Sequence, residues 1–276
     1  MKRWMSVMVF LGLLTGCVSD PGKLTASSSL VDFLYPNKSD YEEHKPETPT
    51  LTLPVRVGIA FVPPSEHNYS SISLSEKRKH EILSEVKEAF ITLDYVSRIE
   101  IISDNYLKAG GGFDTLEQLS RLYHVDVIAL VSYDQVARSN ENNASLLYWT
   151  IAGMYLIPGN SNTTQTFVDT ALFDIDSRKM LFRAPGISKV DSLSTAIGID
   201  ASLQEDTTEG FDLAVDDMIT NLNTELDMFK DRVRTEQIAK IETRSGYSGG
   251  GVSVGVLIAM MGLMISRRHR KLGEKR

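Results

Sequence analysis

The chain has 276 residues, of which 42% are hydrophobic and 24% are charged. This is the composition of an ordinary globular protein and not of a disordered one. The formal charge is −7, but without the basic Lys2, Arg3 and the residues from Arg267 on, 21 basic and 35 acidic side chains remain, a charge of −14. A body this acidic is repelled by nucleic acid and by anionic lipid, so nucleic acid is not expected as a partner.

The amino terminus predicts a bacterial lipoprotein signal. Met1-Lys2-Arg3 is a positive region, Trp4 to Leu14 is apolar, and Leu14-Thr15-Gly16-Cys17 fits the lipobox. We therefore expect a signal helix over residues 1–16, cleavage by signal peptidase II between Gly16 and Cys17, and attachment of diacylglyceryl and palmitate-type chains to Cys17. This is the single cysteine of the chain, so no internal disulfide can form.

The carboxyl terminus predicts a second membrane segment. Gly246-Tyr247-Ser248-Gly249-Gly250-Gly251 precedes an apolar run from Val252 to Ile265, and the basic cluster Arg267-Arg268-His269-Arg270-Lys271 follows it. The uncharged stretch from Gly249 to Ser266 is just long enough for a hydrocarbon core of about 30 Å. Positive charge after a span stays cytoplasmic, so the preceding domain is expected outside. A buried core helix is the alternative, but such helices do not end in a basic cluster.

This tail resembles the GlyGly-CTERM sorting signal, which is recognised by rhombosortases, intramembrane serine proteases of the rhomboid family. The matching features are the run Ser248, Gly249, Gly250 and Gly251, the short apolar span and the basic stop. The resemblance implies cleavage by a rhombosortase in that run, and it leaves type II secretion machinery open as a second partner. Glycine suits a substrate helix that must unwind, because glycine loses the most backbone entropy on entering a helix.

Between the two signals, the chain divides into a polar lipidated tether (17–53), a globular domain (54–236), and a stalk with a glycine hinge (237–251), before the transmembrane sorting tail (252–276). Within the tether, Leu30 to Pro36 is apolar and is expected to dock on the domain. The alternating run Val55 to Val62 predicts the first strand of the domain. The capping-box spacing of Ser73-Leu74-Ser75-Glu76 then predicts a helix that ends near Leu93.

The rest of the domain predicts an α/β (α+β) sandwich. Strands are expected over 96–102, 125–133, 146–157, 166–175 and 180–184, with a short helix from Asp114 before the second of them. After a polar loop with Asp191, Asp200, Glu205 and Asp206, the spacing of Phe211 to Phe229 predicts a final helix. The order β-α-β-α-β-β-β-β-α predicts a mixed β-sheet with helices mainly on one face. That order resembles the periplasmic fold of the lipoprotein activator of penicillin-binding proteins, the curli secretion channel subunit and the amino-terminal domain of the Tol translocation protein.

A closer resemblance covers nearly the whole chain. The lipobox and the glycine-rich tail occur here together with Ser29 to Pro36, Ser132-Tyr133-Asp134-Gln135, Tyr148-Trp149-Thr150 and Leu181 to Gly186. This combination is similar to the rhombotarget lipoprotein family. The resemblance implies an exported lipoprotein processed by a rhombosortase, without an assigned biochemical activity.

Candidate chemistry inside the domain is sparse. A hydrolase would need serine, histidine and a carboxylate, for which His124, Asp126, Ser132 and Asp134 are the nearest cluster, but no G-x-S-x-G elbow is present. The histidines lack metal-ligand spacing, and we expect neither a metal nor a cofactor. Gly110-Gly111-Gly112 forms either an anion nest or, as we favour, a flexible turn.

The polar run Ser132, Tyr133, Asp134 and Gln135 is expected at the end of a buried strand, where it binds a ligand or, by our preferred reading, anchors a loop. The sequence therefore predicts an exported envelope lipoprotein that matures at the outer membrane or cell surface from an inner-membrane precursor. It is expected to act as a non-enzymatic binding or accessory module. The alternatives are an envelope hydrolase assembled near Ser132 and His124, and an uncleaved bitopic scaffold.

Overall fold

The computed structural model describes residues 23–36, 47–64, 74–144 and 155–244. Cys17, the signal helix, the cleavage region 248–251 and the transmembrane tail 252–276 lie outside these ranges, as does most of the strand expected over 146–157. None of the helices in the described ranges is long and apolar enough to cross a membrane.

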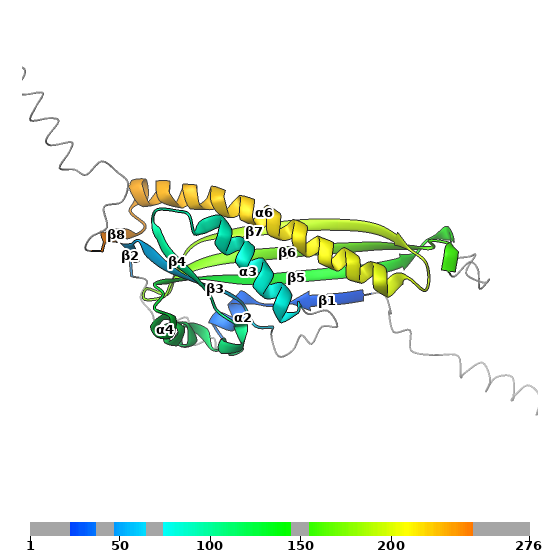
Figure 1. Ribbon diagram of the computed structural model, residues 1–276, viewed down its shortest axis with the longest axis horizontal. Coiled ribbons are helices and arrows are strands. Elements are labelled where there is room, and N and C mark those ends of the chain that lie inside the picture. Colours follow the sequence, from blue (N-terminus) through cyan, green and yellow to red (C-terminus); the bar gives the residue numbers. More distant parts are fainter. Residues whose placement is uncertain (1–22, 37–46, 65–73, 145–154, 245–276) are drawn as a thin grey trace, which may run out of the picture.

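A mixed sheet forms the centre of the molecule (Figure 1), which confirms the α+β class. Its main path runs in the order β4-β3-β5-β6-β7, and a further strand, β1, pairs with the second half of β5. The strand β3 is parallel to both β4 and β5, whereas β5, β6 and β7 are antiparallel. The bounds are β1 (Lys23–Ser27), β3 (Val55–Phe61), β4 (Val96–Ile101), β5 (Val127–Glu141), β6 (Asn160–Asp174) and β7 (Lys179–Ser194).

Helices cover both faces of the sheet. On one face lie α3 (Glu76–Phe90) and the long α6 (Ile199–Glu236), which pack over alternate residues such as Ile59, Val131 and Val168. On the other face, α2 (Leu30–Leu34) and α4 (Gly112–Tyr123) cover one end, over a second core that includes Leu130 and Phe173. A short 3-10 turn, η3 (Asp104–Tyr106), leads from β4 to α4. The alternation of the strands thus supplies two separate cores.

Parts of the expected tether and stalk belong to the fold. As predicted, the island from Leu30 docks on the domain as α2, where Phe33 is only 2% exposed. Three short strands were not expected. The strand β1, from the tether, joins the main sheet, whereas β2 (Thr50–Leu53), from the tether, and β8 (Lys240–Thr243), from the stalk, pair in parallel as a separate two-stranded sheet. The folded region therefore extends beyond the range 54–236 at both ends.

An acid-centred ion-pair cluster fastens β8 to the main sheet. Asp126 accepts hydrogen bonds from the Arg56 backbone at 3.0 Å, from the Arg56 side chain, and from Arg244 Nη2 at 2.6 Å. The Arg244 amide also donates to the Leu53 carbonyl at 2.9 Å, which extends the β2–β8 pairing by one residue. The last described residue of the chain is therefore held beside the first residues of β5.

The first turns of α6 pack partly on a polar seam, beside the apolar core that Phe211 joins. Asp206 is 4% exposed and accepts from Ser192 Oγ at 2.6 Å, and Ser188 Oγ donates to the Gly210 carbonyl at 2.6 Å. The helix backbone approaches β7 so closely that a Cβ at Gly186 would lie 2.0 Å from the Ala214 carbonyl oxygen. Only glycine fits at that position, and its hydrogen-bonded neighbours supply the partners that a buried polar seam requires.

Candidate functional site

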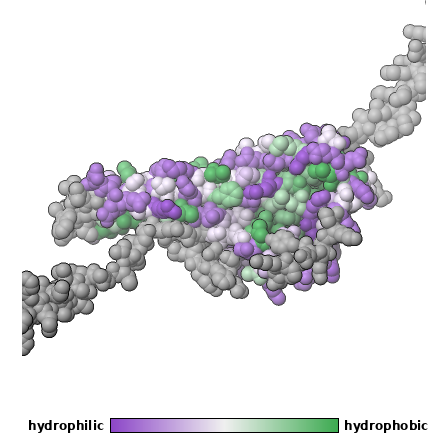
Figure 2. Space-filling view, turned by 180° about the vertical axis from the view of Figure 1, so that it is seen from behind, coloured by the Kyte–Doolittle hydropathy of each residue, from purple (hydrophilic) through white to green (hydrophobic). Residues whose placement is uncertain are grey.

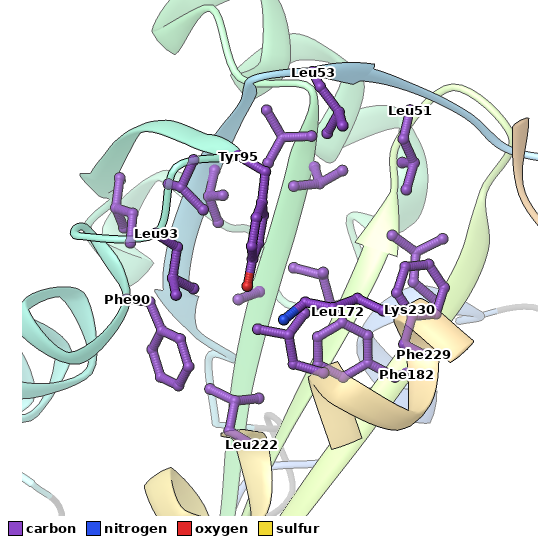
Figure 3. Close-up of a pocket in the computed structure, with 18 of the residues that line it drawn as sticks. Leu51, Leu53, Phe90, Leu93, Tyr95, Leu172, Phe182, Leu222, Phe229 and Lys230 are labelled. Atoms are coloured by element: carbon purple, nitrogen blue, oxygen red, sulfur yellow. The ribbon is translucent and has the colours of Figure 1, made fainter. Parts of the chain in front are cut away.

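An apolar cavity opens between α3 and α6 at one end of the molecule. Near its beginning, α3 is joined to α6 by the ion pair of Arg78 with Asp212. At their far ends, Phe90 of α3 and Phe229 of α6 lie on opposite walls of the space between the helices (Figure 3). The space between the two helices at this end is filled by neither of them.

The cavity has a volume of about 590 Å³ and is walled on four sides. The sheet forms its floor, α3 and the turn after it form one wall, α6 forms the opposite wall, and the β2–β8 pair closes the end. Its apolar lining comprises Leu51, Leu53, Val55, Val57, Ile59, Val86, Phe90, Leu93, Val96, Ile99, Val127, Ala129, Leu172, Leu181, Phe182, Leu222, Leu226, Phe229, Val233 and Ile241. A concave apolar site of this size is typical of pockets for small hydrophobic molecules.

Few polar groups enter this lining, namely those of Tyr95, Thr170, Lys230 and Arg234. The Thr170 hydroxyl is already engaged, because it donates to Met218 Sδ at 2.7 Å. The Tyr95 hydroxyl and the Lys230 ammonium point toward one another in the middle of the cavity (Figure 3). The Lys230 nitrogen also lies 4.9 Å from the centre of the Tyr95 ring, within the range of a cation–π contact.

The Lys230 ammonium keeps its charge at this site. Burial lowers the pKa of Lys230, but interactions with Asp227 and with the Tyr95 hydroxyl outweigh that effect, so its pKa is raised above the ordinary value. Asp227 accepts from the ammonium at 2.8 Å. The Tyr95 oxygen is itself buried and makes no hydrogen bond of standard geometry within the described ranges. The cavity therefore places one charged donor and one phenol together, and its other walls are hydrocarbon apart from Thr170 and Arg234.

The cavity lies at the end of the molecule where the described chain stops. Ile241 of β8, which is 46% exposed, forms part of the wall and of the outer surface. Seen from behind, hydrophobic residues gather toward this same end, while the surface toward the other end is mainly hydrophilic (Figure 2). The apolar surface on this face thus gathers at the end of the molecule that holds β8.

The predicted polar run from Ser132 to Gln135 does not form one cluster. It lies in the middle of β5, which continues to Glu141, so its side chains alternate between the two faces of the sheet. Tyr133 packs against Phe211 with ring centroids 5.4 Å apart, and Gln135 Nε2 donates to Thr166 Oγ1 at 2.7 Å under α6. On the opposite face Asp134 is exposed. The geometry supports the structural interpretation of this run.

The hydrolase candidates are not brought together either. His124 is the exposed, left-handed cap of α4, with φ 54°. Ser132 lies five residues into β5, roughly 17 Å along the strand from Val127, and the closest acceptor for its hydroxyl is the Asp169 carbonyl at 3.5 Å. Asp126 is occupied by its two arginine partners. Within the described ranges, no group of three acidic, histidine or cysteine side chains is placed to hold a metal.

The glycine loop before α4 has a structural explanation. Gly110 and Gly112 have φ angles of +66° and +56°, which side chains other than glycine rarely adopt. A Cβ at Gly112 would lie 2.9 Å from the Leu34 carbonyl oxygen. The loop thus allows α2 to pack closely against the start of α4, which accords with the turn that the sequence favoured over an anion nest.

Sequence reasoning missed the cavity because its end wall comes from segments that read as linkers. The alternation of Thr50-Leu51-Thr52-Leu53 is the signal that could have revealed β2, and Ile241 between Lys240 and Glu242 is a weaker sign of β8. Lys230 directly follows Phe229 in the final predicted helix. The spacing of that helix predicts only that one of its faces is packed, and it does not single out Lys230. No pattern in the sequence indicates that a cavity will remain between two amphipathic helices.

Comparisons with known proteins do not assign this chain to a family. No family model matches it, and no curated protein matches it. Two structures of PelC dodecamers from Paraburkholderia phytofirmans match at a TM-score of 0.24 each. One of them, a point variant, is 13% identical, and the match covers 58% of this chain and 86% of the PelC chain. The other is 8% identical and covers 68% of this chain and 94% of its own. Likenesses this weak carry no argument about function.

Proposed function

We propose that this chain is an exported envelope lipoprotein whose domain binds a small apolar molecule in the cavity between α3, α6 and the sheet. The observation that carries the binding proposal is the 590 Å³ cavity with its almost wholly apolar lining. An unfilled space of this kind costs stability, because its walls lose the packing contacts of a filled core. A binding role is a sufficient reason for the fold to keep such a space.

The cellular part of the proposal rests on the two terminal signals. Cys17 in its lipobox is the proposed lipid attachment site, and the run Ser248 to Gly251 is the proposed rhombosortase site. With lipid holding the amino end, a second anchor is redundant, which favours a removable sorting tail over a bitopic scaffold. The domain would then be an accessory or carrier module and would not perform catalysis.

Mass spectrometry of the mature protein from its native envelope tests both parts. Under denaturing conditions we expect an acylated Cys17 and a carboxyl terminus between Ser248 and Gly251. A mature species that retains Arg276, or an unmodified Cys17, contradicts the processing part.

Under native conditions we expect a bound mass that disappears in the cavity-filling variant Ala129→Phe. Ala129 lies on the cavity floor, so a phenyl ring there occupies the ligand space. The matched control is Ala137→Phe, on the same strand and face but under α6 instead of in the cavity. If Ala129→Phe folds and carries the same bound mass as the wild type, the binding part is wrong.

A further inference from the structure

We infer that the cavity takes a single-chain anionic amphiphile, a long-chain carboxylate, with its head between Lys230 and Tyr95 and its chain over the sheet floor. This inference rests on the proposed binding function, because it names the class of molecule that the same cavity holds. It follows from the size of the space, from the two polar groups inside it and from the place of the cavity relative to the chain end.

The volume matches one acyl chain. At about 30 Å³ per non-hydrogen atom, the share of a water molecule in the liquid, a space of 590 Å³ holds roughly 20 such atoms. That is the size of an eighteen-carbon fatty acid. The apolar run 252–265 of the chain itself is a poor fit, because a helix of that length is about 21 Å long and 10 Å across and occupies on the order of 1,600 Å³.

The polar groups match a carboxylate head. An ammonium group has three donors, and Asp227 takes one of those of Lys230. The Tyr95 hydroxyl adds another donor, since it makes no standard hydrogen bond in the described ranges. A carboxylate has two acceptor oxygens and can accept from both groups, and such charge-assisted hydrogen bonds are among the strong ones. A ligand with no acceptor would gain nothing from either donor.

A second cation stands at the cavity edge. Arg234 follows Lys230 by four residues and therefore lies on the same face of α6. Its side chain is 77% exposed and is 3.8 Å from Asp231, so it remains accessible to an incoming anion. Asp227 and Asp231 partly offset these two charges, but the donors of Lys230 and Arg234 that the aspartates leave over can bind an anion here.

The position of the cavity suggests the source of the ligand. Arg244 is fastened to Asp126 beside the end wall, and the proposed membrane span begins at Gly249, five residues later. Five residues reach at most about 18 Å. While the tail is inserted, the cavity end is therefore held within that distance of the bilayer surface, where long-chain amphiphiles are concentrated.

Photoaffinity labelling of the full chain in phosphatidylcholine vesicles tests the inference. The probes are an eighteen-carbon carboxylate and the corresponding alcohol, each with a photoreactive group on its chain, and adducts are mapped by peptide mass spectrometry. We expect the carboxylate to label cavity residues such as Leu222 and Phe229 about tenfold more than the alcohol does, because only the carboxylate forms the charge-assisted bond. Lys230→Gln should remove that preference, and Lys230→Arg should keep most of it.

Two controls separate this inference from the proposed function. Lys189→Gln removes an exposed cation on β7, outside the cavity, and should change nothing. Ala129→Phe, with Leu222→Trp as a second filler from the opposite wall, should abolish labelling by both probes. Suppose that the two probes label the cavity equally and that both filler variants abolish this labelling. The carboxylate inference is then wrong, but the proposal of apolar binding stands. If labelling of the cavity is absent, or if folded filler variants label as wild type does, both are wrong.

Discussion

At the scale of single residues, the partly buried Asp126 and the buried Asp169 show opposite effects of their surroundings. Burial alone would raise the pKa of Asp126, but hydrogen bonds from Arg56 and the charges of Arg56 and Arg244 outweigh it, and its pKa is lowered. For Asp169, burial is the larger effect, so its pKa is raised despite the contact with Arg183. The two side chains should therefore influence stability with opposite dependence on pH.

We predict that Asp126→Asn lowers the free energy of unfolding by about 1–2 kcal/mol near pH 7, because two arginines lose their charged acceptor. The folded pKa of Asp126 lies below its ordinary value, so its contribution is full above that ordinary value and is lost as the pH falls through the folded pKa. The stability difference between wild type and variant, measured by urea unfolding, should shrink on acidification. A difference that stays constant down to acid pH would contradict this prediction.

Asp169→Asn provides the opposite case. Because the folded pKa of Asp169 is raised, the folded state prefers its protonated form, and ionisation above that pKa costs stability. We predict that the free energy of unfolding of this variant, relative to that of the wild type, is higher at neutral pH than at acid pH. The same urea titration measures it. If the stability of both variants relative to the wild type changes in the same direction with pH, the environments assigned to the two aspartates are wrong.

At the scale of elements, α6 joins two different kinds of packing in one helix. Its first turns lie partly on the polar seam around Asp206, and its second half lines the cavity with Leu222 and Phe229. The close approach of helix and sheet at Gly186 lies between these two parts. That approach fixes the height of the helix above the sheet, and with it the shape of the cavity further along.

We predict that Gly186→Ala costs about 3 kcal/mol of stability, at the upper end of the range for overpacking, because the new methyl group meets helix backbone that cannot rotate away. Gly198→Ala is the matched control. There the nearest atom is the Thr195 Oγ1 at 3.0 Å, a side-chain atom that can move, and the cost should stay under about 1 kcal/mol. Thermal unfolding of both variants measures the difference, and equal costs would show that the contact is not tight.

The β2–β8 pair is the element most open to a specific test. Arg244→Gln removes one donor to Asp126 and should loosen β8, and thereby the end wall of the cavity. We predict at least tenfold faster amide hydrogen exchange at Leu51 and Leu53, about 1.4 kcal/mol in local opening. Arg234→Gln, which removes an exposed cation at the same end, should leave these rates unchanged. Unchanged exchange in Arg244→Gln would mean that backbone pairing alone holds the strand.

The sequence predicted elements well where polarity and burial agree. Ile82, Leu83, Val86 and Phe90 form the buried face of α3, as the spacing indicated, although the cap that accepts from the Arg78 amide is Ser75 and not the Ser73 of the predicted capping box. Prediction failed where buried positions are polar. Gln135 of β5 and Thr164 of β6 are buried polar residues, so β5 is predicted to end too early and β6 to begin too late, and the buried Asp206 is predicted in a loop. A polar seam has no hydrophobic periodicity, and the candidate cavity depends on long-range packing that no local pattern encodes.

At the scale of the whole molecule, the two ends of the described chain lie far apart. Lys23 pairs with Arg138 of β5, whereas Arg244 is bound to Asp126, which directly precedes β5. Twelve residues of strand separate Asp126 from Arg138, roughly 40 Å. Cys17 is six residues before Lys23, so its proposed lipid lies within about 20 Å of the end of the molecule opposite to the cavity.

We predict that cleavage of the tail changes the orientation of the domain on the membrane. A fluorophore at Lys179→Cys, at the cavity end of β7, and one at Ser161→Cys, near the opposite end of β6, report the distance of each end from a lipid-surface quencher. Both variants keep Cys17. Its proposed lipid occupies the sulfur, so thiol reagents label only the introduced cysteine. With the tail intact, both fluorophores should be quenched. After cleavage, only the fluorophore at position 161 should remain quenched. Continued quenching at position 179 would contradict the prediction.

The separation of the two ends gives the glycine run a proposed mechanical role. If Cys17 carries lipid and the tail is inserted, the elongated body is attached at both ends and lies along the bilayer. Cutting the tail would then leave a lever about 40 Å long that pivots on the acyl group. The cavity would swing away from the membrane together with its contents. In that arrangement, a single peptide-bond cleavage would convert a loading position into a delivery position, without any change in the fold.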